Sequence, residues 1–223
     1  MDVIETIRAR KSIRGYKPDP VPQEVLRDII DIASRAPSSL NIQPWEVTVV
    51  TGEVLKNLSQ GNMEMDASGA TPNPDLPSLP YTDKYKQRQV ELGIQMFELM
   101  GITREDKEKR VQWGQRGRRY FDAPAAIFVY VDELLKERVL SLIDIGLFVQ
   151  TLCLAAQSYG LGTCIMGSGI NFPEVVRKFT QIPDSKQLII CITIGYPDGD
   201  FPANKIATKR ESVDNFVTWY GFE

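Results

Sequence analysis

The hydrophobic pattern opens with two amphipathic helices. Residues 3–7 carry an apolar stripe directly after Asp2, and Glu5 stands three residues beyond Asp2, which is the spacing of a capping box. A second set of apolar residues recurs at helical spacing between Pro22 and Pro37. Proline suits the first turn of a helix and cannot continue one, so this helix is expected to begin near Pro22 and to end before Pro37.

Four further apolar segments predict strands. Residues 45–50 alternate and are rich in β-branched side chains. Residues 125–131 and 188–194 are continuously apolar, as expected for strands that are covered on both faces, and residues 163–167 form a shorter run of the same kind. The chain is therefore expected to build a sheet with a buried centre.

Helical patterns separate these strands. The most hydrophobic one spans residues 141–159 and ends at two glycines. Shorter helices are expected at 53–58 and 173–179. Two more are expected before the second strand: one with an apolar face between residues 90 and 101, and a highly charged one over 103–119. No repeat or linker divides the sequence, so we predict one α+β domain over residues 1–223.

Residues 61–82 differ from the rest of the domain. Four prolines interrupt a stretch of glycine, asparagine and serine that has almost no aliphatic side chains. Such a segment cannot bury itself and is too long for a plain connector, so it is either disordered or a lid over a site. We favour a lid insertion.

Charge and composition narrow the chemistry. The 223 residues carry a formal charge of -3 with a pI near 5.3, and this lack of basic excess argues against nucleic acid as a partner. The chain contains no histidine, which excludes Ser-His-Asp and Cys-His hydrolases and His-ligated metals. Either a carboxylic acid, lysine, tyrosine or water acts as the proton donor, or a bound cofactor carries the chemistry.

The cysteines and the amino terminus indicate a cytoplasmic protein. Cys153, Cys164 and Cys191 form an odd set without a CxxC spacing, and all lie in apolar patterns, so reduced buried thiols are expected; a reactive thiol is the alternative. The first residues do not resemble a secretory signal. The longest uninterrupted apolar stretch, 123–131, is too short to span a bilayer, so no membrane association is expected.

The clearest candidate for binding chemistry follows the first helix. In an extended segment, residues two apart point the same way, so Arg10, Ser12 and Arg14 would present two guanidinium groups and a hydroxyl to one spot while Ile13 faces the core. This arrangement suits a phosphate, because arginine donors match its oxygens. A solvated basic patch at the end of a helix explains the same spacing equally well.

Three weaker signals lie elsewhere. The loop 37–43 offers hydroxyls and amides that could bind a polar heterocycle, or could simply satisfy its own backbone. Residues 166–169 place two glycines directly after a buried strand, where the backbone could approach a flat ligand or merely turn. Lys209 and Arg210 form a basic pair beyond the last strand. Together these signals suggest a planar, anion-bearing ligand, although neither a Rossmann fingerprint nor a P-loop is present.

The order of these motifs resembles one family over nearly the whole chain. The segments RARKSIRGY, APSSLNIQPWEVTVVTG, GLGTCIMGSGI, ITIGYPDG and KRESVDNFV are similar to those of FMN-dependent nitroreductases, and the segment around residues 81–113 is similar to the nitrobenzoate-reductase-like branch. The resemblance implies a mixed, mainly antiparallel sheet flanked by helices. It also implies an intertwined homodimer in which the tail from about residue 200 packs on the partner subunit.

The resemblance also implies a cofactor site and an activity. FMN would be reduced by NAD(P)H and would then reduce a small nitroaromatic or related aromatic acceptor in a ping-pong cycle, so no catalytic side chain or metal is expected. A reductive dehalogenase of the same family and a non-catalytic FMN-binding protein are the alternatives. The residues that match the family's cofactor site are Arg10, Lys11, Ser12, Arg14, Pro37, Ser38, Ser39, Asn41, Met166, Gly167, Ser168, Gly169, Lys209 and Arg210.

Overall fold

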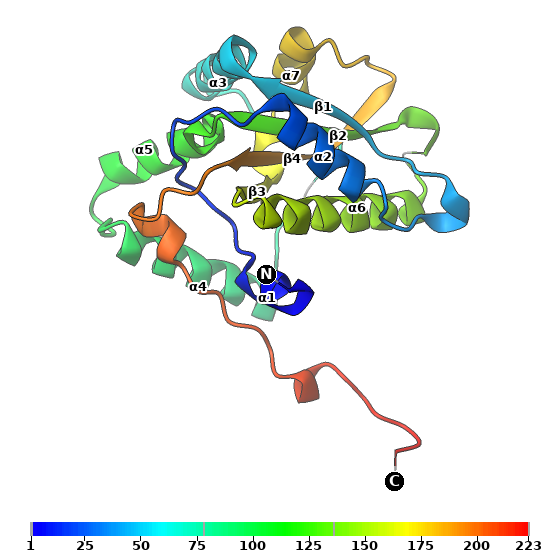
Figure 1. Cartoon of the computed structure of the whole chain (residues 1–223). Coiled ribbons are helices and arrows are strands. Elements are labelled where there is room, and N and C mark those ends of the chain that lie inside the picture. Colours follow the sequence, from blue (N-terminus) through cyan, green and yellow to red (C-terminus); the bar gives the residue numbers. More distant parts are fainter. Residues whose placement is uncertain (1, 78, 136, 223) are drawn as a thin grey trace.

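A computed structural model describes residues 2–77, 79–135 and 137–222, and Figure 1 shows how its elements are arranged. Helices and strands are interleaved along this part of the chain. The elements are α1 (Val3–Ala9), α2 (Gln23–Ala33), β1 (Glu46–Thr51), α3 (Gly52–Ala67), α4 (Asp83–Leu99), α5 (Lys107–Arg118), β2 (Ala125–Asp132), α6 (Val139–Ser158), β3 (Gly162–Met166), α7 (Pro173–Thr180) and β4 (Lys186–Gly195).

The four strands form one sheet in the order β1-β2-β4-β3, and every neighbouring pair is antiparallel. Along the outer edge of β3, Ser12 forms a parallel bridge with Thr163. The predicted mixed, mainly antiparallel sheet is thus confirmed. The bridge also fixes the segment that follows α1 beside β3.

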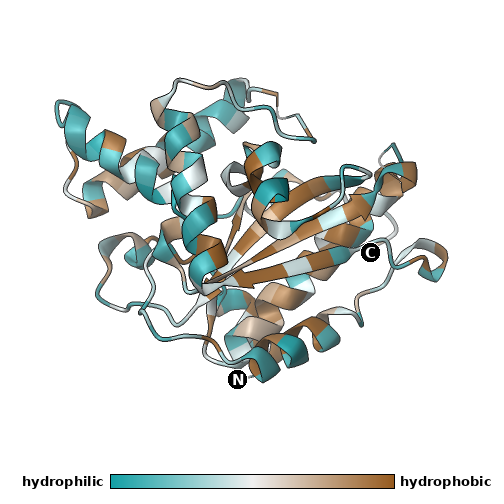
Figure 2. Cartoon of the chain, turned by 90° about the horizontal axis from the view of Figure 1, so that it is seen from above, coloured by the Kyte–Doolittle hydropathy of each residue, from teal (hydrophilic) through white to brown (hydrophobic). Residues whose placement is uncertain are grey.

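Both faces of the sheet are buried, as the continuous apolar runs predict. Phe128 of β2 and Cys191 of β4 pack with α3 and α7, whereas Ile127 and Ile192, one residue away on each strand, pack with α2 and α6. In Figure 1, α3 and α7 lie above the sheet and α6 lies below it. Figure 2 shows the strands mostly in the hydrophobic colour.

Helix boundaries follow local signals closely, with one exception. Asp2 and Glu5 form the expected capping box at α1, and the backbone N–H of Thr103 donates to the side chain of Asp106, which precedes α5. The helix expected over 53–58 is too short, because α3 continues to Ala67. Asn62 is buried there, and its amide donates to the Tyr120 hydroxyl at 3.0 Å, so a polar residue serves as a core residue.

The first part of segment 61–82 is therefore helical, and further along the segment Asp75 is bonded to α7 and β4. Asp75 accepts a hydrogen bond from Arg177 Nη2 at 2.6 Å and another from the backbone N–H of Leu188 at 2.8 Å. Residue 78 of the expected lid lies outside the described residues. That this segment covers a site stays a prediction.

The C-terminal segment changes character at about residue 207. Ala203 and Ile206 pack against Met96 of α4 within the same chain. Beyond them the chain leaves the domain, as the red end of Figure 1 shows. The large apolar side chains of this tail are solvent-exposed, namely Val213, Phe216, Trp219, Tyr220 and Phe222.

Helix α6 combines a buried face with an exposed apolar face. Ile145, Phe148 and Leu152 are buried against the sheet, whereas Ile143 is 53% exposed and Leu147 is 41% exposed. The helix is long and apolar enough to cross a membrane by length and composition alone, but half of its most apolar window is buried in the domain. It is the core helix that the sequence predicts.

The three cysteines are free and buried, as expected. Burial raises the pKa of all three thiols, so they stay protonated near neutral pH.

Candidate functional site

The segment 10–14 lies along the outer edge of β3. The backbone N–H of Ile13 donates to the Thr163 carbonyl at 2.9 Å, and the Ile13 side chain is buried, as the alternation predicts. Burial raises the pKa of the Cys164 thiol, and Arg14, the Ser12 hydroxyl and Arg10 oppose this effect. Arg10, Ser12 and Arg14 are all half-buried.

Two residues that the sequence patterns did not single out hold this segment in place. The buried Asn204 accepts from the backbone N–H of Arg14 at 2.7 Å and donates to the Gly15 carbonyl at 2.7 Å. Arg116 of α5 donates from Nε to the Arg14 carbonyl at 3.4 Å. A side chain at Gly15 would collide with the ring of Phe201, so glycine is required there. The backbone of the Arg-Lys-Ser-Ile-Arg segment is thereby fixed.

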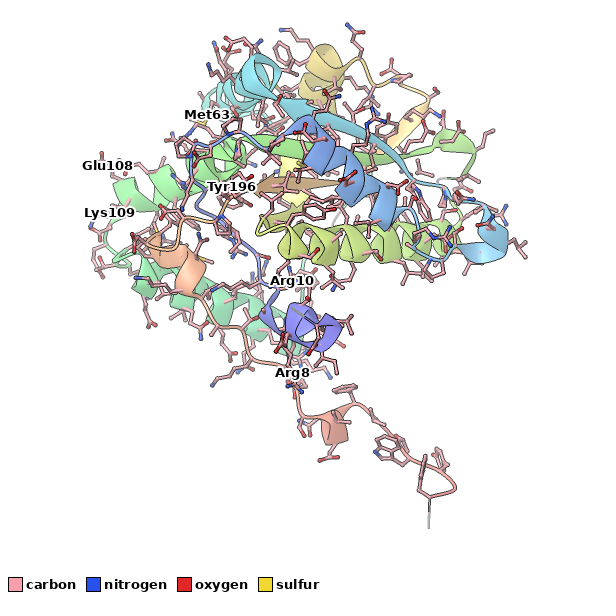
Figure 3. The ribbon with its side chains drawn as sticks, viewed as in Figure 1. Arg8, Arg10, Met63, Glu108, Lys109 and Tyr196 are labelled. Atoms are coloured by element: carbon pink, nitrogen blue, oxygen red, sulfur yellow. The ribbon has the colours of Figure 1, made fainter. Side chains whose placement is uncertain are left out.

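A cavity of about 320 Å³ lies beside Arg10 and Lys11. Its walls come from the end of α6, the start of β3 and the residues after α1. This volume is at the lower end of the range of small-ligand sites. Figure 3 shows Arg10 between α1 and the end of α6. Residues 10–14, the cationic segment predicted from the sequence, thus border a cavity.

The residues after β3 form a short turn on the same edge of the sheet. Met166 and Gly169 are buried, whereas Gly167 and Ser168 are exposed. A Cβ atom at Gly169 would lie 2.7 Å from Cβ of Cys191, so only glycine fits there. The Gly169 carbonyl accepts from the Tyr120 hydroxyl at 3.1 Å. At Gly167, by contrast, no described atom beyond its chain neighbours lies within 4 Å of an added Cβ, so a flat group could approach its backbone.

The loop 37–41 lies elsewhere in the same chain. The backbone N–H of Ser39 donates to Asp144 Oδ1 at 3.1 Å, near the start of α6. Gln157, which lines the cavity beside Arg10, lies thirteen residues further along that helix. At 1.5 Å per residue the separation is about 20 Å. One copy of the chain therefore does not bring loop 37–41 to the cationic segment.

This loop has a strained backbone and a buried anchor that no sequence pattern indicated. Leu40 and Asn41 have φ angles of 53° and 59°, in the left-handed region that residues other than glycine rarely adopt. Asp144 is 3% exposed, and its second carboxylate oxygen has no partner among the described residues. Pro37 and Asn41 are exposed, and Ser38 and Ser39 are half-buried, so the loop presents polar groups outward.

Lys209 and Arg210 are exposed on the C-terminal segment. Arg210 Nη1 donates to Thr208 Oγ1 at 2.8 Å and to the Lys209 carbonyl at 3.0 Å. The expected contribution of this basic pair to the site stays a prediction.

Comparison with known proteins identifies the family. The sequence model of the nitroreductase family matches residues 7–196, a span that includes the cationic segment, loop 37–41 and the glycine-containing turn after β3. The chain belongs to the nitroreductase family. The resemblance noted in the sequence motifs is confirmed.

Individual members of the nitroreductase family are similar to this chain over nearly its whole length. A 4-nitrobenzoate reductase of Pseudomonas putida is 33% identical over 224 residues, covering 100% of this chain and 97% of the relative. A 4-nitrobenzoate reductase of Nocardioides sp. (strain LMS-CY) is also 33% identical, over 96% of this chain and 87% of the relative. The crystal structure of an FMN- and NADPH-dependent nitroreductase, NfnB, from Sphigopyxis sp. strain HMH superposes with a TM-score of 0.91 at 28% identity, with 100% of both chains covered.

Proposed function

We propose that this nitroreductase-family protein is an FMN-dependent oxidoreductase that takes hydride from NAD(P)H and reduces nitroaromatic or related aromatic acceptors in a ping-pong cycle. The observation that carries this proposal is the edge of β3, where a fixed cationic segment stands beside an open, glycine-containing turn. Two relatives at 33% identity are 4-nitrobenzoate reductases, which supports a nitroaromatic acceptor.

The residues present along this edge suit FMN. Two guanidinium groups, a lysine and a hydroxyl match the oxygens of a phosphate and a ribityl chain, and the cavity beside Arg10 and Lys11 provides space for them. The open position at Gly167 leaves room for a planar ring against the backbone. We assign phosphate and ribityl binding to Arg10, Lys11, Ser12 and Arg14, with Lys209 and Arg210 as further phosphate ligands, and contact with the ring to Met166, Gly167, Ser168 and Gly169.

The chemistry then divides between cofactor and protein. FMN supplies hydride acceptance and hydride donation when it is bound. The chain orients the ring through the turn after β3, and its backbone N–H groups and nearby cations favour negative charge on the ring. No imidazole is needed, which agrees with a sequence without histidine. The segment that follows α3, anchored by Asp75, would shape the acceptor pocket.

A second copy of the chain would complete the site. Loop 37–41 lies about 20 Å along α6 from the cationic segment, so its polar groups can reach a cofactor only on another copy. Exposed apolar side chains on α1, α6 and the tail provide a surface for association, with Ile4, Leu147 and Trp219 as examples. We infer an intertwined cytoplasmic homodimer in which Pro37, Ser38, Ser39 and Asn41 of one copy approach the FMN of the other.

An anaerobic absorbance experiment tests the activity. The purified protein is expected to be yellow, to lose its visible absorbance on addition of NADH or NADPH, and to regain it when 4-nitrobenzoate is added. Separate additions in this order also test the ping-pong sequence, because each half of the cycle must proceed without the other substrate. A flavin that NAD(P)H leaves oxidised, or that 4-nitrobenzoate does not reoxidise, would contradict the proposal.

A further inference from the structure

A second cavity, with a lining separate from that of the cavity beside Arg10, lies near the junction of β1 and α3. Its volume is about 730 Å³, within the range of small-molecule sites. It is bounded by residues 18–21, by the first turns of α3 and by the turn 119–124 that leads into β2. In Figure 3, Met63, which lines this cavity, lies at the upper side of the molecule, away from Arg10.

The walls of this cavity combine apolar surface with cationic groups. Apolar side chains form part of the lining, with Pro20, Leu55 and Met63 among them. Two cationic residues, Lys56 and Arg119, also line the cavity. An amphipathic ligand with an aromatic or aliphatic body and an anionic group would match both features.

The charges of the lining leave a positive excess. The Asp122 carboxylate is shared between Arg119, whose Nε lies 2.9 Å from Oδ1, and Arg116, whose Nη1 lies 2.8 Å from Oδ2. One carboxylate thus faces two guanidinium groups. Lys56 pairs with Glu53 at 3.1 Å, but both side chains are 77% exposed, so this pair contributes little. An incoming carboxylate would therefore find a partner in Arg119.

The turn 119–124, which lines this cavity, also contacts residues of the proposed FMN site at the edge of β3. Tyr120, Phe121 and Asp122 all have φ angles of 55°, so three consecutive residues hold an unusual left-handed conformation. The Tyr120 hydroxyl donates to the Gly169 carbonyl at 3.1 Å. Arg116, the second partner of Asp122, donates to the Arg14 carbonyl. The turn is thus bonded directly to Gly169 and, through Arg116 of α5, to the segment that carries Arg14.

We propose that this cavity binds an aromatic carboxylate, with its ring against Pro20, Leu55 and Met63 and its carboxylate on Arg119. Binding would draw Arg119 away from Asp122 and leave Asp122 to Arg116, which holds the Arg14 carbonyl. Occupancy of the cavity would then alter the affinity for FMN, and by linkage FMN would alter the affinity for the carboxylate to the same extent. This second part rests on the proposed FMN site, whereas binding in the cavity does not.

Isothermal titration calorimetry with 2-naphthoate, a carboxylate without a nitro group, tests the binding. The wild-type protein as purified is expected to bind it, and Arg119→Gln is expected to weaken binding about tenfold or more, the effect of losing one charged hydrogen bond. Ser59→Phe fills the cavity at another of its lining residues and should abolish binding. Arg110→Gln removes an equal charge from α5, on a residue that stacks over Phe97, and should leave binding unchanged.

The outcomes separate the proposal from the proposed function. Binding that Arg119→Gln and Ser59→Phe leave intact would place 2-naphthoate elsewhere and overturn the proposal, as would absence of binding by the wild-type dimer. Neither result depends on whether the protein turns over a nitroaromatic. For the linkage, saturating 2-naphthoate is expected to change the dissociation constant of FMN about fivefold or more in the wild type and in Arg110→Gln, but not in Arg119→Gln. An equal FMN dissociation constant with and without 2-naphthoate would overturn the linkage.

Discussion

Replacing Tyr120 by phenylalanine tests how the turn before β2 supports the candidate site. The Tyr120 side chain is fully buried, and its hydroxyl links three elements. It accepts from Asn62 Nδ2 of α3 at 3.0 Å and donates to the Gly169 carbonyl after β3 at 3.1 Å. Burial raises the pKa of Tyr120, so the hydroxyl is a donor at any ordinary pH.

The expected cost follows from these contacts. Phenylalanine preserves the ring and its edge-on contact with Phe128, whose centroid lies 5.9 Å away, so the packing contribution is unchanged. Asn62 keeps its bond to the Arg118 carbonyl, but the Gly169 carbonyl loses the Tyr120 donor. Two buried hydrogen bonds at about 1 kcal/mol each predict a loss of about 2 kcal/mol in the free energy of unfolding. For a chain of this length that is about 4–8 °C in Tm.

Urea denaturation at a fixed protein concentration measures this loss, since the stability of a dimer depends on concentration. Tyr130→Phe is the matched control, because its hydroxyl makes one half-buried contact, with Thr48 at 3.2 Å, and should cost less than about 1 kcal/mol. Tyr120→Phe should also weaken FMN binding, because the turn that carries Gly169 is released. Equal effects of the two substitutions on stability would refute the reasoning.

Three further predictions concern the site, the second copy and the segment after α3. Arg10→Ala should weaken FMN binding about 10- to 100-fold, through loss of a charged hydrogen bond to phosphate, while the exposed Arg8→Ala should not; equal titrations of apoprotein with FMN would contradict this. Leu147→Asp places a charge on the exposed apolar face of α6 and should yield a monomer with little flavin in light scattering; an intact yellow dimer would count against the inferred interface. Asp75→Asn removes the charge that pairs with Arg177 at 2.6 Å and should cost about 1–3 kcal/mol in urea unfolding; an unchanged midpoint would show that the segment is held by other contacts.

Elements governed by local pattern could be predicted from the sequence. The capping box of Asp2 and Glu5 involves neighbouring residues only, and the apolar runs of β2 and β4 report burial on both faces directly. The length of α3 could not be predicted in this way. Asn62 is buried because its amide bonds to Tyr120, 58 residues away, and no local pattern distinguishes such an asparagine from one in a loop.

Some features of the candidate site could likewise be predicted from local sequence, and others could not. The two-residue spacing of Arg10, Ser12 and Arg14 is local and could be read from the sequence. The contacts of Asn204 and Arg116 with the same segment depend on the tertiary fold, because these residues come from distant parts of the chain. The role assigned to loop 37–41 depends on a second copy, and the roles of this loop, Lys209 and Arg210 stay predictions.

Native mass spectrometry of the purified protein tests most directly whether one FMN site is built from two copies of the chain. A symmetric pair, each copy completing the other's site, predicts a dimer that carries two FMN molecules and releases them when it dissociates. The single substitution Leu147→Asp should then remove both the dimer and the flavin. A monomer that retains FMN, or a dimer that does not bind added FMN, would contradict the account.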